Sequence, residues 1–112
     1  MKQCGLSRRE RLISPLQFKS VYQQKRAAKH TLIWLYRMPN GLGFSRLGIS
    51  VSNKFCVNIV ARNKIKKIFR RVFQCNKKCF GEGVDIILVL KQKSDQINYA
   101  YLEKIILGLA KK

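Results

Sequence analysis

The stretch from residue 61 to residue 74, ARNKIKKIFRRVFQ, places cationic side chains at helical spacing. Its cations are spread along the whole stretch: Arg62, Lys64, Lys66, Lys67, Arg70 and Arg71. Arg62, Lys66 and Arg70 recur at the spacing of one helical turn and therefore share a face. Such a row suits a phosphate backbone, because each cation displaces condensed counterions. Arginine can also fork onto a phosphate or a base edge, and Asn63 adds an amide that donates and accepts.

The whole chain is strongly basic. Its 112 residues include 24 Lys and Arg against 5 Asp and Glu, which gives a formal net charge of +19. The five acidic residues can form ion pairs with only a few of the basic ones. Most of the cations must therefore face water or a polyanionic partner. Nucleic acid is the first expectation for that partner, and an anionic membrane surface is the second.

Aromatic residues upstream of the basic stretch are candidates for stacking on unpaired bases. They are Phe18, Tyr22, Trp34 and Tyr36. Phe18 and Tyr22 are four residues apart and share one face of a predicted helix, which ordinary core packing would also explain. Aromatic rings beside a basic groove favour single-stranded nucleic acid, and no zinc-finger, leucine-zipper or helix-turn-helix pattern is present.

Residues suited to catalysis or metal binding are sparse. His30 is the only histidine, and the acids are scattered, with Asp85 inside an apolar run where it has a structural role. The cysteines (Cys4, Cys56, Cys75 and Cys79) include no CxxC pair, so we expect neither a zinc site nor disulfides. The sequence therefore predicts an RNA-binding protein without catalytic or metal-binding residues of its own.

The elements that must position these residues begin with a helix. Ser14 is a good N-cap and Pro15 fits the first helical position. A strand follows over Thr31 to Met38, with Leu32, Trp34 and Tyr36 on one side and Ile33 and Leu35 on the other. The sequence PNGLG, residues 39–43, predicts a hairpin turn.

The next strand has a small-residue side that leaves a shallow floor for a backbone or a nucleic-acid strand, and we expect the first helix and the basic helix to form the walls beside this floor. Leu47, Ile49 and Val51 alternate there with Gly48, Ser50 and Ser52. A half-exposed strand with small polar residues is the alternative interpretation.

The basic helix is predicted to begin at an Asn58 cap and to continue to residue 80. Its apolar stripe consists of Ile65, Ile68, Phe69, Val72 and Phe73. The glycines of residues 81–83 end this region, and the continuous apolar run Val84–Leu90 predicts a strand buried on both faces. A final helix, capped by Asp95 or Asn98, carries the stripe Leu102, Ile105, Ile106 and Leu109.

The element order is therefore α-β-β-β-α-β-α, with Cys56–Val57 as a possible place for the third strand. It predicts an α+β fold, a small two-layer α/β sandwich in one domain over residues 1–112, with a strand–helix–strand (βαβ) unit around the basic helix. No run is long enough to span a bilayer or to form a secretory signal, so we expect a cytoplasmic protein.

The segments RLGISVSNK, RNKIKKIFR, DIILVL and YLEKIILGL, with LQFKSVY before them, resemble the protein component of bacterial ribonuclease P in content and order. The resemblance covers nearly the whole chain. In that family a large RNA subunit removes the 5′ leader from precursor tRNA with magnesium ions, while the protein binds the leader in a cleft and contacts the RNA through its basic helix. The resemblance also implies a left-handed strand–helix–strand crossover, as in ribosomal S5 domain 2, against the general right-handed preference.

The resemblance implies roles for individual residues. The basic helix would bind RNA through Arg62, Asn63, Lys64, Lys66, Lys67, Arg70 and Arg71. The leader cleft would consist of Phe18, Tyr22, Trp34, Tyr36, Ser50, Ser52 and Lys54. Lys64 and Lys67 replace two motif arginines, which keeps the charge and loses the planar fork.

The partners implied are the ribonuclease P RNA and precursor tRNA, with Mg²⁺ held through RNA and substrate rather than by protein residues. We expect the protein to bind no membrane and to need no obligatory protein partner. The alternatives are a ribosomal or other structural RNA-binding protein, a membrane-active cationic protein, and an enzyme that cuts RNA by itself.

Overall fold

The computed structural model describes residues 11, 15–23, 27–51, 58–81, 83–91 and 98–111. The helices in these ranges are α1 (Pro15–Gln23), α2 (Ile59–Cys75), α3 (Lys77–Phe80) and α4 (Tyr99–Ala110). The strands are β1 (Ala27–Lys29), β2 (Ile33–Pro39), β3 (Arg46–Ser50) and β4 (Val84–Leu90). They form one sheet in the order β1-β2-β4-β3. The predicted α+β class and element order are confirmed.

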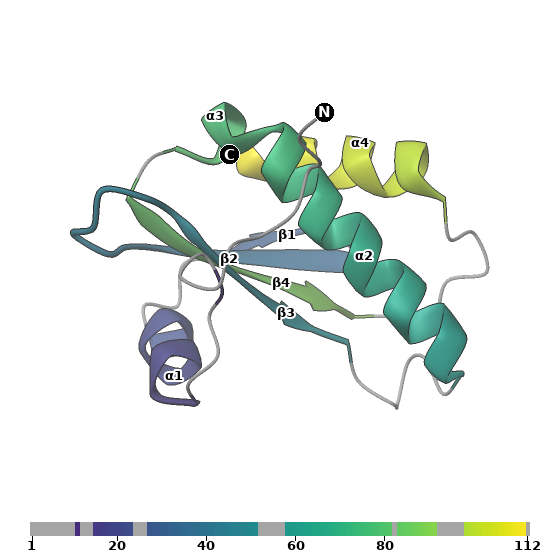
Figure 1. Ribbon diagram of the computed structural model, residues 1–112, viewed down its shortest axis with the longest axis horizontal. Coiled ribbons are helices and arrows are strands. Elements are labelled where there is room, and N and C mark those ends of the chain that lie inside the picture. The colour runs from purple at the N-terminus through teal and green to yellow at the C-terminus, as the bar shows by residue number, and fades with distance from the viewer. Residues whose placement is uncertain are drawn as a thin grey trace.

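The sheet is covered unequally on its two faces. The helices α2, α3 and α4 lie over one face, and α1 alone lies against the other (Figure 1). The main hydrophobic core fills the first interface, while among the described residues the interface under α1 has two fully buried apolar residues, Val21 and Ile87. No helix in the described ranges has the length and apolar character needed to cross a bilayer.

Strand β4 occupies the centre of the sheet. It pairs antiparallel with β2 on one side and parallel with β3 on the other. Its apolar residues are buried on both faces, as the continuous apolar run predicted. The parallel pair β3 and β4, joined through α2, is the predicted βαβ unit. Its left-handed sense remains a prediction from the resemblance.

The two long helices begin at the predicted caps. Asn58 Oδ1 accepts hydrogen bonds from the backbone N–H groups of Val60 (2.8 Å) and Ala61 (3.2 Å). Asn98, rather than Asp95, caps α4 by accepting from the N–H of Tyr101 at 2.8 Å. The predicted stripe of α2 is buried in full: Ile65, Ile68, Phe69, Val72 and Phe73. In α4, Ile105 is only half-buried, and Ala110 takes part in the core in addition to the predicted positions.

The predicted basic helix is interrupted near its end. Asn76 has non-helical dihedral angles (φ −134°, ψ 34°), and its side-chain amide donates to the Val72 carbonyl (2.9 Å) and to Glu103 (3.2 Å). An asparagine side chain that bonds to nearby backbone competes with helix continuation. The short helix α3 then buries Phe80, whose ring centroid lies 5.4 Å from that of Phe73.

The prediction that residues 39–43 close a hairpin is wrong. The strands on either side, β2 and β3, are not neighbours, because β4 lies between them. An apolar strand such as β4 is most stable with a neighbour on each side, so it takes the central place. The hairpin is formed instead by β1 and β2, where His30 Nδ1 accepts from the Leu32 N–H at 3.0 Å. The third strand is thus β1, which the sequence analysis missed, and residues 56–57 lie outside the described residues.

The side-chain alternation predicted for Thr31 to Met38 is correct only from Ile33 onward. Leu32 lies in the bend before β2 and packs in the main core with Ile33 and Leu35, not on the side of Trp34 and Tyr36. A residue in a bend is not bound by the two-residue period of a strand.

Arg37 connects the ends of α3 and α4 to the sheet by hydrogen bonds. From β2 its guanidinium donates to the Phe80 carbonyl at the end of α3 (3.3 Å) and to the Ala110 carbonyl at the end of α4 (2.9 Å). Helix C-termini carry carbonyl groups without intrahelical partners and a partial negative charge, so a cation there is favourable.

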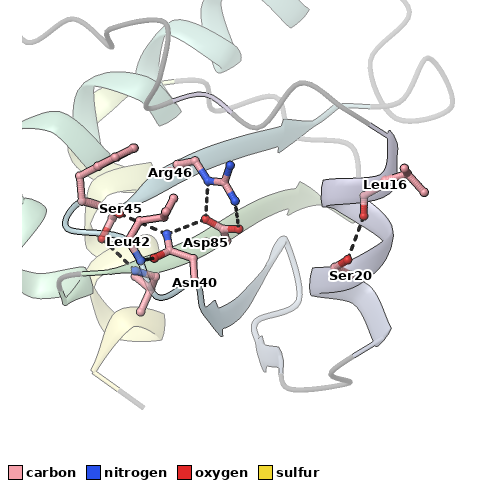
Figure 2. Close-up of polar contacts among 9 residues, drawn as sticks. Leu16, Ser20, Asn40, Leu42, Ser45, Arg46 and Asp85 are labelled. Atoms are coloured by element: carbon pink, nitrogen blue, oxygen red, sulfur yellow. Dashed lines mark hydrogen bonds and ion pairs between the residues drawn. The ribbon is translucent and has the colours of Figure 1, made fainter.

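Asp85, expected to be structural, is the buried charged residue of the described chain, at 1% exposure. Both oxygens accept from Arg46, at 2.8 and 2.6 Å, and Asn40 donates to the same carboxylate at 2.8 Å (Figure 2). Asn40 also accepts from the Leu42 N–H at 2.7 Å. The carboxylate therefore joins β4 to β3 and to the connection that leaves β2.

The expectation that the cysteines form no disulfide is wrong for Cys75, which is disulfide-bonded. Cys75 is the exposed last residue of α2, where its thiol is accessible to another cysteine; the partner lies outside the described residues. Cys79 is free and exposed.

We expect Arg46→Ala to lower the free energy of unfolding more than Asp85→Ala does. Removal of Arg46 leaves a buried carboxylate without its cation, which costs about 3–5 kcal/mol. Removal of Asp85 leaves a guanidinium that still reaches solvent, with 19% of the side chain exposed, so we expect a loss of about 2 kcal/mol. Urea unfolding followed by circular dichroism measures both values.

The control for this comparison is Ser20→Ala. It removes the exposed hydrogen bond from Ser20 to the Leu16 carbonyl on α1, which is 3.0 Å long (Figure 2). A change within about 0.5 kcal/mol is expected for such a surface site. Equal losses for Arg46→Ala and Asp85→Ala, or the reverse order, would show that the Asp85 carboxylate does not depend on its ion pair.

Candidate nucleic-acid interface

The face of the sheet beside α1 carries a series of aromatic rings, which we call the aromatic face: Phe18, Tyr22, Tyr36 and Trp34. Neighbouring ring centroids are 6.4 Å (Phe18–Tyr22), 4.9 Å (Tyr22–Tyr36, edge to face) and 6.4 Å (Tyr36–Trp34) apart. Tyr22 is 36% exposed and the other three are half-buried. The structure thus brings together all four predicted aromatic residues and leaves them partly open to solvent.

The length of α1 explains this partial exposure. The helix has nine residues, and it contacts β2 and β4 through the fully buried Val21, which packs against Ile87. Around this pair, Phe18, Tyr36, Met38 and Val89 are only partly buried. The nine residues of α1 therefore cover this face only in part, and aromatic surface stays available.

Strand β3 contributes small residues to the same face. The register places Gly48 beside Ile87 and Ser50 beside Val89. Tyr22 is hydrogen-bonded to Ser50; burial raises the pKa of the Tyr22 hydroxyl, and this bond opposes the rise. Ser50 therefore lies at the aromatic face as predicted, while Ser52 and Lys54 lie outside the described residues.

The basic helix does not wall this face, contrary to the arrangement expected from the sequence. Helix α2 packs on β3 from the opposite side of the sheet (Figure 1). Its apolar stripe is needed over the main core, and this requirement fixes the side on which the helix lies.

The cations of α2 divide into two rows. Arg62, Lys66 and Arg70 form a half-buried inner row, and Lys64, Lys67 and Arg71 form an exposed outer row, with the neutral Asn63 exposed beside them. Burial, and then the charge of Arg11, lowers the pKa of Arg70. Arg11 forms a backbone β-bridge with Leu47 at the outer edge of β3. Arg70 of the inner row therefore lies near that edge of the sheet.

The outer row borders a hollow that the sequence analysis missed. Lys64, Lys67 and Arg71 line a cavity of about 590 Å³ together with Ile68 of the same helix and with Asn98 and Tyr99 at the start of α4. The Arg71 guanidinium lies 5.7 Å from the Tyr99 ring centroid. Burial raises the pKa of Tyr99, assisted by Glu103 and opposed by Arg71. Of the residues at the start of α4 that line this cavity, the sequence analysis had singled out Asn98 alone, as a helix cap.

Two further cations missed by sequence reasoning lie at the aromatic face. The Nζ atoms of Lys29 and Lys91 are 4.5 and 4.4 Å from the Trp34 ring centroid. They come from different strand ends that meet only in the folded sheet, and no sequence motif connects them. Within the described ranges, no group of three or more His, Cys, Asp or Glu side chains is placed to hold a metal ion.

The fold and this surface define a small, strongly basic α+β protein with an aromatic face. The family model described as Ribonuclease P matches residues 6–112. Ribonuclease P protein components of Lachnoclostridium phytofermentans and Alkaliphilus oremlandii are 32% and 30% identical to the chain. The alignments cover 91% and 85% of this chain and 87% and 82% of those relatives.

Solved structures with the same fold support this relationship. The ribonuclease P protein of Staphylococcus aureus matches with a TM-score of 0.81 at 27% identity, over 91% of this chain and 93% of that one. The ribonuclease P protein of Thermotoga maritima matches with a TM-score of 0.80 at 27% identity, over 91% and 96%. The chain belongs to the ribonuclease P protein family.

Proposed function

We propose that this protein is the protein subunit of a ribonuclease P holoenzyme. In this role it binds the catalytic RNA through α2 and the 5′ leader of precursor tRNA on the aromatic face. The observation that carries the proposal is the arrangement of two different surfaces around β3. Half-exposed aromatic rings lie on one side of the sheet, and a row of cations lies on the other, with Arg70 near the outer edge of β3.

The aromatic face suits an unpaired leader for a physical reason. Bases of a single strand are free to stack, and base–aromatic stacking contributes about 1–3 kcal/mol per base. The small residues Gly48 and Ser50 allow a nucleic-acid backbone to approach the sheet closely. A helical tRNA acceptor stem keeps its bases paired and gains none of this stacking.

The cations of α2 suit a folded RNA. The inner and outer rows meet phosphates by counterion release, which requires no particular sequence. By screening the repulsion between substrate and catalytic RNA, the protein lets the two polyanions associate at lower magnesium concentrations. In this proposal the RNA subunit performs the cleavage, and magnesium ions are held by RNA and substrate.

Reconstitution tests the proposed function. The protein is added to a bacterial ribonuclease P RNA at low magnesium, and cleavage of precursor tRNA at its 5′ end is followed. We expect the protein to increase cleavage in this regime and to cut nothing without the RNA. RNA binding with no change in cleavage would instead favour a structural RNA-binding protein, and cleavage by the protein alone would contradict RNA-based chemistry.

Tyr22→Ala should weaken binding of leader-bearing tRNA by about tenfold, because it removes one stacking contact worth about 1.4 kcal/mol. Affinity for mature tRNA, which has no leader, should change little. Direct binding of both RNAs to the reconstituted holoenzyme measures the ratio. Tyr101→Ala is the matched control, since Tyr101 is an exposed tyrosine (41%) on α4, at the other face of the sheet. Equal losses for leader-bearing and mature tRNA would reject the leader assignment.

Arg62→Ala combined with Arg70→Ala should weaken assembly with the catalytic RNA and flatten its salt dependence. If each arginine meets one phosphate, the slope of log affinity against log salt should fall by about 1.4 to 1.8. Filter binding over a salt series measures this slope. The control removes the same charge from Lys78 on α3 and Lys104 on α4, two exposed residues outside α2. If the slope does not change in the arginine variant, α2 is not the RNA-binding element.

A further inference from the structure

The ammonium groups over Trp34 form a cluster that the leader cleft as predicted from the sequence does not include. Lys29 lies directly opposite Trp34 in the β1–β2 pairing. Lys91 follows β4, and its backbone N–H donates to the Leu32 carbonyl at 2.8 Å, just before β2. Pairing on both sides of β2 therefore brings both side chains to one indole ring, 4.5 and 4.4 Å from its centroid.

The charge of this cluster is not balanced within the described chain. Neither lysine is in a described ion pair, because the described carboxylates are engaged elsewhere. Asp85 is bound by Arg46, and Glu103 of α4 accepts from Asn76. Two like charges therefore share one ring. A cation over an aromatic face is worth only about 0.5–1 kcal/mol at an exposed site, so a phosphate is a better partner for each ammonium group.

The cluster is continuous with the aromatic face. The Trp34 ring centroid is 6.4 Å from that of Tyr36, and both side chains are half-buried on the face beside α1. In the sheet register Trp34 lies beside Val89, which in turn lies beside Ser50. The row of Tyr22 and Tyr36 is thus extended by one more ring, and this ring has two cations next to it.

We propose that Lys29 and Lys91 join Trp34 of the aromatic face in a subsite that holds one unpaired nucleotide of the leader. On binding, the flanking phosphates draw the two ammonium groups away from the indole, and the base stacks on the ring surface that they leave. Stacking of about 1–3 kcal/mol and the phosphate contacts together exceed the two cation–ring contacts that are lost. The subsite selects precursors whose leader is single-stranded at this position, and it rests on the proposal that the aromatic face binds the leader.

Trp34 is the only tryptophan of the chain, so fluorescence excited selectively at tryptophan, which leaves out the four tyrosines, reports on this subsite. The protein is titrated with a single-stranded leader oligoribonucleotide and with an abasic oligomer of the same length and phosphate number. We expect the leader to quench Trp34 emission strongly and the abasic oligomer to quench it much less, because only a base can stack. Equal quenching by both, or none by the leader, would overturn the subsite.

The two lysines are tested by Lys29→Gln with Lys91→Gln, which removes both charges and keeps part of each apolar stem. Loss of two phosphate contacts to a single strand should lower the slope of log affinity against log salt by about 1.4. Lys78→Gln with Lys104→Gln, on the other face of the sheet, removes the same charge and should leave the slope for the leader nearly unchanged. A slope equal to that of the unmodified protein in the Lys29 and Lys91 variant would overturn the role of these lysines.

Failure of this subsite can be distinguished from failure of the proposed function. If the holoenzyme prefers leader-bearing over mature tRNA and that preference is lost in Tyr22→Ala, the aromatic face binds the leader. Unchanged Trp34 emission in that case overturns the subsite alone. If the unmodified holoenzyme shows no preference for leader-bearing tRNA, both proposals fail.

Discussion

The burial of β4 on both faces is the constraint on which the rest of the structure depends. An apolar central strand needs apolar cover on each side. The two covers differ: α2, α3 and α4 close one face over the main core, whereas the nine residues of α1 close only part of the other. The aromatic face exists because this second cover is incomplete, since Tyr36 and Trp34 belong to the strand that pairs with β4 and yet lie beyond full reach of α1.

The packing of apolar cover on both faces of β4 also determines where the charged residues lie. The described interior admits one buried charged residue, Asp85, and satisfies it with Arg46 and Asn40. The other cations of a chain with a net charge of +19 must therefore be at the surface or at helix ends, as Arg37 is. Helix α2 has to turn its stripe toward the core, so its two cationic rows face outward on the side opposite the aromatic rings. Under the proposed function, this separation gives the catalytic RNA and the leader different places to bind.

Local patterns in the sequence were sufficient to predict much of this arrangement. The stripe and Asn58 cap of α2, the apolar run of β4 and the pairing of Phe18 with Tyr22 follow from helical and strand periods alone. The position of β4 between β2 and β3 could not be predicted in this way. A turn sequence does not indicate whether a strand about forty residues further along the chain inserts between its two neighbours. The strand β1, Ala27–Lys29, is too short and too poor in strand formers to be recognised. Lys29 reaches Trp34 through the missed β1–β2 pairing and Lys91 through the β2–β4 pairing, so no local pattern could have indicated that they meet.

The account depends most on the claim that the incompletely covered face of the sheet receives the single strand. Amide chemical-shift mapping tests this claim directly, with isotopically labelled protein titrated with a single-stranded leader oligonucleotide. The account predicts the largest shifts in α1 and around Tyr36 and Ser50, with little change around Tyr101 on α4. Shifts confined to the α2 and α4 side, with the aromatic face unchanged, would contradict it.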